Sequence, residues 1–72
     1  MYFPRLRDLR EDADRTQADM AAYLGIQQTV YSRYERGFQT IPLEHLINLA
    51  DYYHVSLDYL TGRSNVQMVQ KK

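Results

Sequence analysis

The segment 28–36 carries side chains whose hydrogen-bonding groups match the exposed edges of DNA bases. A glutamine amide can bond N6 and N7 of adenine, and an arginine guanidinium can fork onto O6 and N7 of guanine. Thr29 offers a hydroxyl and a methyl group that suit thymine, and the short side chain of Ser32 lets a helix approach the bases closely. We therefore predict four residues that contact bases in the major groove: Gln28, Thr29, Ser32 and Arg33.

An alternative for this segment is an ordinary polar helix surface that faces water. Two observations count against that alternative. The outward positions, which also include Arg36, contain no carboxylate, although nine of the 72 residues are Asp or Glu. The end of the preceding helix is also expected to point the same way. Base contact is therefore the favoured interpretation of this face.

The composition argues against catalytic, metal and cofactor chemistry. There is no cysteine, which excludes disulfides, thiolate zinc sites and cysteine nucleophiles. His45 and His54 are isolated and lack the carboxylate partner that would complete a metal site. The chain also has no Ser/His/Asp set, no paired carboxylates in a plausible cleft and no glycine-rich phosphate loop. We predict no enzymatic activity, no metal and no cofactor.

The charge balance gives DNA binding no general support. Nine Lys and Arg residues are matched by nine Asp and Glu residues, so the formal net charge is zero. Nucleic-acid binders are usually basic, and non-specific DNA affinity comes mainly from neutralised phosphates. We therefore expect weak non-specific binding, and the case for DNA rests on where the charges are placed.

Apolar residues recur at helical spacing through most of the chain, and no stretch alternates long enough to indicate a strand. Helix start and stop signals divide this pattern into five short helices. The signals are Pro4, a Thr16–Asp19 capping box, Gly25, Gln28, Gly37, Pro42, Ser56 and Gly62. The expected inward residues are Leu6, Leu9, Ala13, Met20, Ala21, Leu24, Tyr31, Tyr34, Leu43, Leu46, Ile47, Ala50 and Tyr53.

The domain organisation follows from the length and from this helical pattern. We predict one all-α domain over residues 1–62, followed by a flexible C-terminal tail over residues 63–72, where no apolar stripe continues. No apolar run approaches the ~20 residues of a membrane span, and no signal-peptide pattern opens the chain. We therefore expect a cytoplasmic protein without a membrane partner.

The second and third predicted helices are joined by a very short turn, Gly25-Ile26-Gln27. A turn of this length forces the helices to cross steeply, which is the helix-turn-helix arrangement. Such a crossing needs a small residue where the helices approach, and Ala21 fits that position. It also needs bulky inward residues on the third helix, which Tyr31 and Tyr34 provide.

Two stretches of the chain resemble the phage Cro and repressor family, also known as the xenobiotic-response-element-like family. Residues 16–37, TQADMAAYLGIQQTVYSRYERG, are similar to that family's helix-turn-helix. Residues 42–62, PLEHLINLADYYHVSLDYLTG, are similar to its fourth and fifth helices. The resemblance covers residues 5–62 and implies a compact five-helix, lambda-repressor-like DNA-binding domain.

The resemblance also implies roles for residues outside the base-reading face. Gln17, in the first turn of the second helix, would contact a DNA phosphate, although it could also be a simple solvated residue. Arg10 and Glu35 would form a structural ion pair, the alternative being a surface pair of little energetic weight. The loop 38–41 contains no lysine or arginine, unlike some phage repressors. Phosphate contacts here would come from backbone N–H groups, from Gln39 and Thr40 of the loop, and from Arg36 just before it.

The implied function is a transcriptional regulator, most simply a repressor, that binds double-stranded DNA. One domain reads few base pairs, so specificity is expected to need a homodimer on a pseudo-palindromic operator. The dimer face implied by the resemblance is the fifth helix, with Leu57, Asp58 and Tyr59. The alternative is a protein-interaction module of the same fold, such as an antitoxin.

Overall fold

The structure is a computed structural model, and it describes residues 2–65. This part of the chain forms five helices and contains no strand, which confirms the predicted all-α fold. None of the described helices combines the length and the apolar character that a membrane crossing requires. The helices are α1 (Pro4–Asp12), α2 (Gln17–Leu24), α3 (Gln28–Arg36), α4 (Leu43–Tyr53) and α5 (Leu57–Leu60).

The helix ends of the α2–α3 unit follow the signals in the sequence. The Asp19 N–H donates to Thr16 Oγ1 at 3.0 Å, and the Thr16 N–H donates to Asp19 Oδ2 at 2.9 Å, which completes a capping box. The hydrogen bond from the Thr16 N–H, and then the Thr16 hydroxyl beside the same carboxyl, hold the pKa of Asp19 below its usual value. Gly25 ends α2 with φ +71°, a left-handed conformation that glycine adopts without steric cost.

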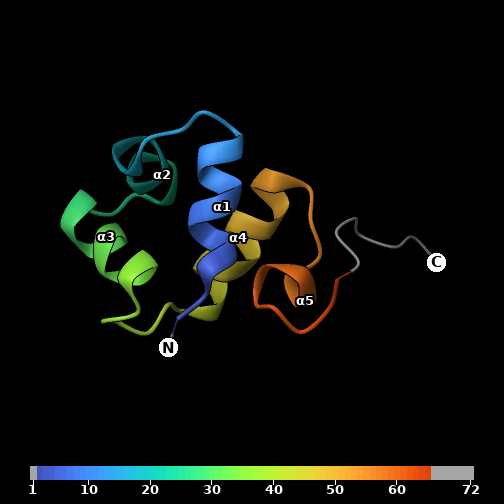
Figure 1. Cartoon of the computed structure of the whole chain (residues 1–72). Coiled ribbons are helices and arrows are strands. Elements are labelled where there is room, and N and C mark those ends of the chain that lie inside the picture. The colour runs from blue at the N-terminus through green and yellow to red at the C-terminus, as the bar shows by residue number, and fades with distance from the viewer. Residues whose placement is uncertain (1, 66–72) are drawn as a thin grey trace.

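The turn at residues 25–27 places α3 directly against α2. The Ile26 N–H donates to the Ala21 oxygen at 3.0 Å, so the chain reverses within one short hydrogen-bonded turn. Ala21 is buried, as a close crossing requires. Figure 1 shows α2 and α3 together on one side of the molecule and α5 on the other, with α1 and α4 between them. The helix-turn-helix therefore stands at one edge of the domain.

The core is a single cluster to which every helix contributes. Tyr31 of α3 is the largest of its fully buried side chains. Burial of this apolar surface is the main favourable term in folding such a small domain. The buried apolar residues are Leu6, Leu9, Met20, Ala21, Tyr31, Tyr34, Ile41, Leu46, Leu49, Ala50, Val55 and Leu60.

The predicted inward face was wrong in part. On α4, Leu43 is 61% exposed and Ile47 is 44% exposed, whereas Leu49 is fully buried. The buried stripe of α4 follows positions 46, 49 and 50, with Tyr53 half-buried at its end, and the exposed pair lies to one side of it. Ala13 is also exposed, because α1 ends at Asp12 and Ala13 lies beyond the last turn.

The loop between α3 and α4 contains a core residue that the helical pattern did not identify. Ile41 is buried, although it lies outside every helix. Its side chain ties the end of the loop to the core just before α4 begins at Leu43. Residues 38–40 of the loop are therefore exposed, and the chain returns to the core at residue 41.

Arg5 joins the first turn of α1 to the end of the described chain. Its Nη1 donates to the backbone oxygens of Tyr59, at 2.8 Å, and Ser64, at 2.7 Å. Its Nη2 donates to Asn65 Oδ1 at 3.0 Å. The guanidinium carbon also lies 4.0 Å from the centroid of the Tyr59 ring, a cation–π contact. One side chain thus connects α1, α5 and residues 64–65.

Only residues 63–65 of the tail predicted over residues 63–72 lie within the described chain. The N–H groups of Arg63 and Ser64 donate to the Asp58 oxygen at 2.8 and 3.2 Å. Together with the contacts of Arg5, these hydrogen bonds attach residues 63–65 to the domain. The rest of the predicted tail, residues 66–72, lies outside the described residues, and the boundary at residue 62 stays a prediction.

Replacement of Arg5 by alanine should lower the free energy of unfolding by about 1–3 kcal/mol, because several carbonyl acceptors lose a charged donor. The free energy of unfolding of Arg5→Lys should lie between those of the wild type and Arg5→Ala, since an ammonium group cannot reproduce the planar fork. Urea denaturation with an unchanged m-value measures the loss. Arg7→Ala is the matched control, because its pair with Glu11 is exposed and worth only a few tenths of a kcal/mol. Equal losses for Arg5→Ala and Arg7→Ala would contradict this role of Arg5.

Candidate nucleic-acid interface

The four predicted base-contacting residues lie on one helix, α3, in its first two turns. The side chains of Gln28, Thr29 and Arg33 are exposed, and Ser32 is half-buried. The structure therefore presents one amide, one hydroxyl and one guanidinium to the outside, with a second, shorter hydroxyl beside them. These groups supply the donors and acceptors that base edges in a major groove can pair with.

The opposite side of α3 is held by two tyrosines. Tyr31 and Tyr34 are both buried, one turn apart, as the sequence predicted. The Tyr34 ring lies 6.2 Å from the His45 ring of α4, so the two helices also meet through aromatic side chains. Burial raises the pKa of the Tyr31 hydroxyl, and the neighbouring Glu35 carboxylate raises it further. Tyr31 is therefore uncharged at every physiological pH, as its place in the core requires.

A buried ion pair fixes the end of α3 to α1. Arg10 Nε donates to Glu35 Oε2 at 2.6 Å, and Arg10 Nη2 donates to Glu35 Oε1 at 3.2 Å. Only 4% of the Glu35 side chain and 12% of the Arg10 side chain are exposed. Arg10 Nη1 also donates to the Arg15 oxygen at 2.8 Å, which draws in the loop between α1 and α2. The two-point fork restricts orientation as well as distance.

The electrostatics of this pair follow from its partners. Burial alone raises the pKa of the Glu35 carboxyl, but the hydrogen bonds from Arg10 and Gln17, with the charge of Arg10, outweigh burial and hold the pKa below its usual value. The hydrogen bond with Glu35 raises the pKa of Arg10. Both groups are therefore charged at neutral pH, and each needs the other because an unpaired buried charge is very costly.

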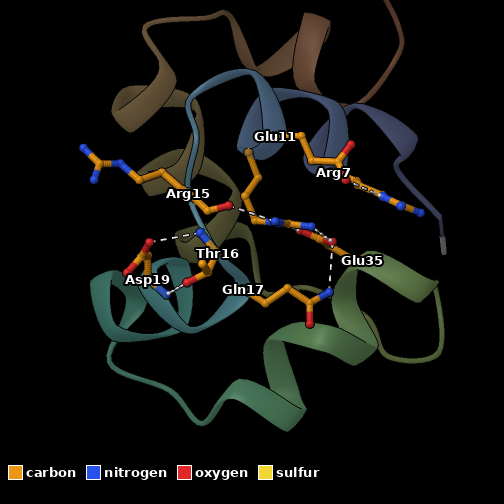
Figure 2. Close-up of polar contacts among 8 residues, drawn as sticks. Arg7, Glu11, Arg15, Thr16, Gln17, Asp19 and Glu35 are labelled. Atoms are coloured by element: carbon orange, nitrogen blue, oxygen red, sulfur yellow. Dashed lines mark hydrogen bonds and ion pairs between the residues drawn. The ribbon is translucent and has the colours of Figure 1, made fainter.

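Gln17 joins the same network from α2. Its Nε2 donates to Glu35 Oε1 at 3.2 Å, and Figure 2 shows its oxygen pointing away from Glu35. The sequence suggested a phosphate contact for Gln17 and a separate ion pair for Arg10 and Glu35, but the structure brings all three together. No local sequence signal indicates this contact, because it joins residues 18 positions apart on two helices.

The predicted phosphate-contacting residues after α3 lie on its last turn and on the loop that follows. Arg36, Gln39 and Thr40 are all exposed. The Arg36 guanidinium carbon lies 4.6 Å from the centroid of the Phe38 ring, so this cation rests on an aromatic face. Sequence reasoning gave Phe38 no role, although it is the most exposed of the large apolar side chains in the described chain.

Part of the predicted dimer face on α5 already contacts another residue of the same chain, Arg5. Tyr59 is half-buried beneath the Arg5 guanidinium, so one face of its ring is already in contact within the chain. Leu57 is half-buried and Asp58 is exposed. Both line a mainly apolar hollow of about 410 Å³ at the junction of α4 and α5, together with Phe3, Leu43, Leu46, Thr61 and Arg63.

The Glu35→Gln substitution should destabilise the domain by on the order of 3 kcal/mol at neutral pH, because Arg10 keeps a buried charge without a counter-charge. The lowered pKa of Glu35 adds stability that is fully present above its ordinary value of 4.5 and is lost as the pH falls through the lower folded-state value. The difference in unfolding free energy between the wild type and the variant should therefore shrink below pH 4.5.

Urea denaturation across the range from neutral pH to strong acid measures this difference. Asp19→Asn is a useful comparison, because that carboxyl also has a lowered pKa but caps an exposed helix end and faces no buried cation. Asp19→Asn should lower the free energy of unfolding at neutral pH far less than Glu35→Gln does. A Glu35→Gln deficit that stays constant into strong acid would contradict the proposed charge pairing.

Comparison with known proteins gives the family. A helix-turn-helix family model matches residues 6–60, which includes all of α2 and α3. The transcriptional repressor RstR of the cryptic phage CTXphi from Vibrio cholerae is 41% identical over 59 residues, covering 82% of this chain and 53% of the relative.

Two regulators from Bacillus subtilis are similarly close. The HTH-type transcriptional regulator YobD is 40% identical over 62 residues, covering 86% of this chain and 55% of the relative. The HTH-type transcriptional regulator ImmR is 37% identical over 62 residues, covering 86% of this chain and 49% of the relative. The chain thus spans about half the length of these relatives. By its helix arrangement and by these matches, the chain belongs to the helix-turn-helix family of the phage Cro and repressor type.

Proposed function

We propose that this chain is a transcriptional regulator, most simply a repressor, that binds a specific double-stranded DNA sequence by placing α3 in the major groove. The observation that carries the proposal is the division of α3 into a buried aromatic side and an exposed side of amide, hydroxyl and guanidinium groups. The relatives named as a phage repressor and as transcriptional regulators support the same function.

The contacts divide into those that read the sequence and those that position the protein. Arg33 forks onto a guanine, Gln28 pairs with an adenine, and Thr29 and Ser32 complete the base contacts. Phosphates are held by Gln17 at the start of α2 and by Arg36, Gln39 and Thr40 after the base-reading turns. Tyr31 and Tyr34 make no base contact, because their side chains are buried.

The neutral charge of the chain shapes how such a protein works. With a formal net charge of zero, few phosphates are neutralised, so non-specific affinity is weak and the salt dependence is shallow. Discrimination between sites then depends on base contacts and on the combination of two half-sites. A rigidly held α3 serves this purpose, because misplaced donors would lose the bidentate geometry that separates one base pair from another.

A homodimer supplies the second half-site. Two half-sites one helical turn apart require recognition helices roughly 34 Å apart in a two-fold arrangement. We place the dimer contact on the α4–α5 hollow, where Leu43 is 61% exposed beside Leu57 and Asp58. Tyr59 contributes less than the sequence suggested, because Arg5 covers its ring.

Selection from a pool of random duplexes with the purified chain tests the proposed function directly. The expected product is a two-fold symmetric site with defined base pairs in each half. The proposal fails if no sequence is enriched even at low salt, where electrostatic attraction is strongest.

Arg33→Ala and Gln17→Ala should weaken DNA binding in different ways. Loss of the Arg33 fork should cost about 1–3 kcal/mol and relax the preference at one base pair in each half-site. Loss of Gln17 should weaken binding to all sequences nearly equally, because a phosphate carries no base identity. Equilibrium binding to the selected site and to its single-base variants measures both effects. If both variants lose affinity equally for all sequences, Arg33 does not contact a base.

Leu43→Ser should weaken dimerisation and the binding of a full operator by roughly tenfold, because an exposed apolar side chain leaves the contact. Binding to a duplex with a single half-site should not change. Ile47→Ser is the matched control, since it removes an exposed side chain from the same helix outside the hollow. Analytical ultracentrifugation and titration with both duplexes give the result, and equal effects of the two substitutions would place the dimer face elsewhere.

A further inference from the structure

A hollow beside the proposed interface is lined by cationic and aromatic side chains, and two of them, Arg7 and Tyr2, have no part in the proposed DNA contacts. It has a volume of about 470 Å³ and lies where α1, the start of α2 and the end of α3 meet. Gln17 and Arg36, two of the proposed phosphate contacts, form part of its wall. Arg7 of α1, Tyr2 and Phe38 line the rest, together with the Arg10–Glu35 pair.

The charge of this hollow differs from that of the whole chain. Three arginines and one glutamate line it, although the chain has a formal net charge of zero. Arg10 is committed to Glu35 by the buried fork. Within residues 2–65, Arg7 pairs with Glu11 of its own helix, at 3.1 Å, and both side chains are largely exposed. An exposed pair of this kind is weak, so Arg7 can turn to an anion at little cost.

The aromatic residues at the rim of the hollow suit a ligand that has an apolar part beside its anionic group. Tyr2 is 63% exposed and Phe38 is 70% exposed, yet both border a hollow lined with cations. The Arg36 guanidinium already rests on the Phe38 ring, which orients the cation along the rim. A chain of alternating phosphates and deoxyriboses offers anionic oxygens to the arginines and apolar C–H faces to the rings. A small inorganic anion would leave the rings without a partner.

We propose that this hollow seats the sugar–phosphate backbone of the bound duplex, with Arg7 donating to a phosphate and with Phe38 and Tyr2 packing on the adjoining deoxyriboses. This inference rests on the proposed function, because it assigns a further part of the same DNA contact. It adds a contact from α1, an element outside the helix-turn-helix. It also places two exposed aromatic side chains in a binding role that a search for basic residues would not find.

The test compares variants of the full chain on a duplex that contains one half-site, so that dimer contacts do not enter. Arg7→Gln should reduce the slope of log affinity against log salt by about 0.9, the value for one phosphate contact on duplex DNA. Arg7→Lys should keep the slope. Arg63→Gln is the charge-matched control, because Arg63 lines the α4–α5 hollow on the far side of the molecule from α2 and α3.

Phe38→Ser should weaken binding about tenfold and should change the salt slope less than Arg7→Gln does, because it removes apolar contact and no charge. Ile47→Ser, another exposed apolar side chain, should leave half-site binding unchanged. The inference is overturned if the wild type selects a sequence while Arg7→Gln matches Arg63→Gln in slope and Phe38→Ser keeps full affinity. Failure of the wild type to select any sequence overturns the proposed function itself, so the two failures are distinct.

Discussion

The position of the recognition helix depends on one buried ion pair. Glu35 is held by a two-point fork from Arg10 and by the Gln17 amide, so a single carboxylate of α3 contacts both α1 and α2 (Figure 2). The net energetic gain of such a pair is small, because both charges lose their hydration. Its geometric effect is large, since an arrangement that moved α3 away from α1 would leave the Glu35 carboxylate buried without its counter-charge.

Because the Arg10–Glu35 pair fixes α3, one face of this helix can serve the core while the other faces outward. Tyr31 and Tyr34 fill the core, Glu35 joins the network, and the outward positions are left without a structural duty. A protein without excess positive charge cannot rely on phosphate attraction for tight binding, so the precision of α3 carries more of the specificity. A locally cationic hollow, lined by Arg7 and Arg36, lies at the end of α3 that the ion pair fixes.

Local signals in the sequence were sufficient for the elements of the fold. The capping box at Thr16 and the glycine that ends α2 use short-range hydrogen bonds and steric rules, so residue types indicate them directly. The register of α4 was misread, because Leu43 and Leu49 have the same apolar character and only tertiary packing decides which is buried. The contacts of Arg5 with residues 59–65 join distant parts of the chain, and no periodicity reveals them.

The central claim is that the outward face of α3 is the DNA-reading surface. Amide chemical-shift mapping by NMR, with the chain titrated by its selected duplex and by a scrambled duplex, tests this claim most directly. The selected duplex should shift the amides of residues 28–36 and the amide of Gln17 more than the scrambled duplex does, with little change along α4. Shifts that concentrate on α4 and spare residues 28–36 would contradict it.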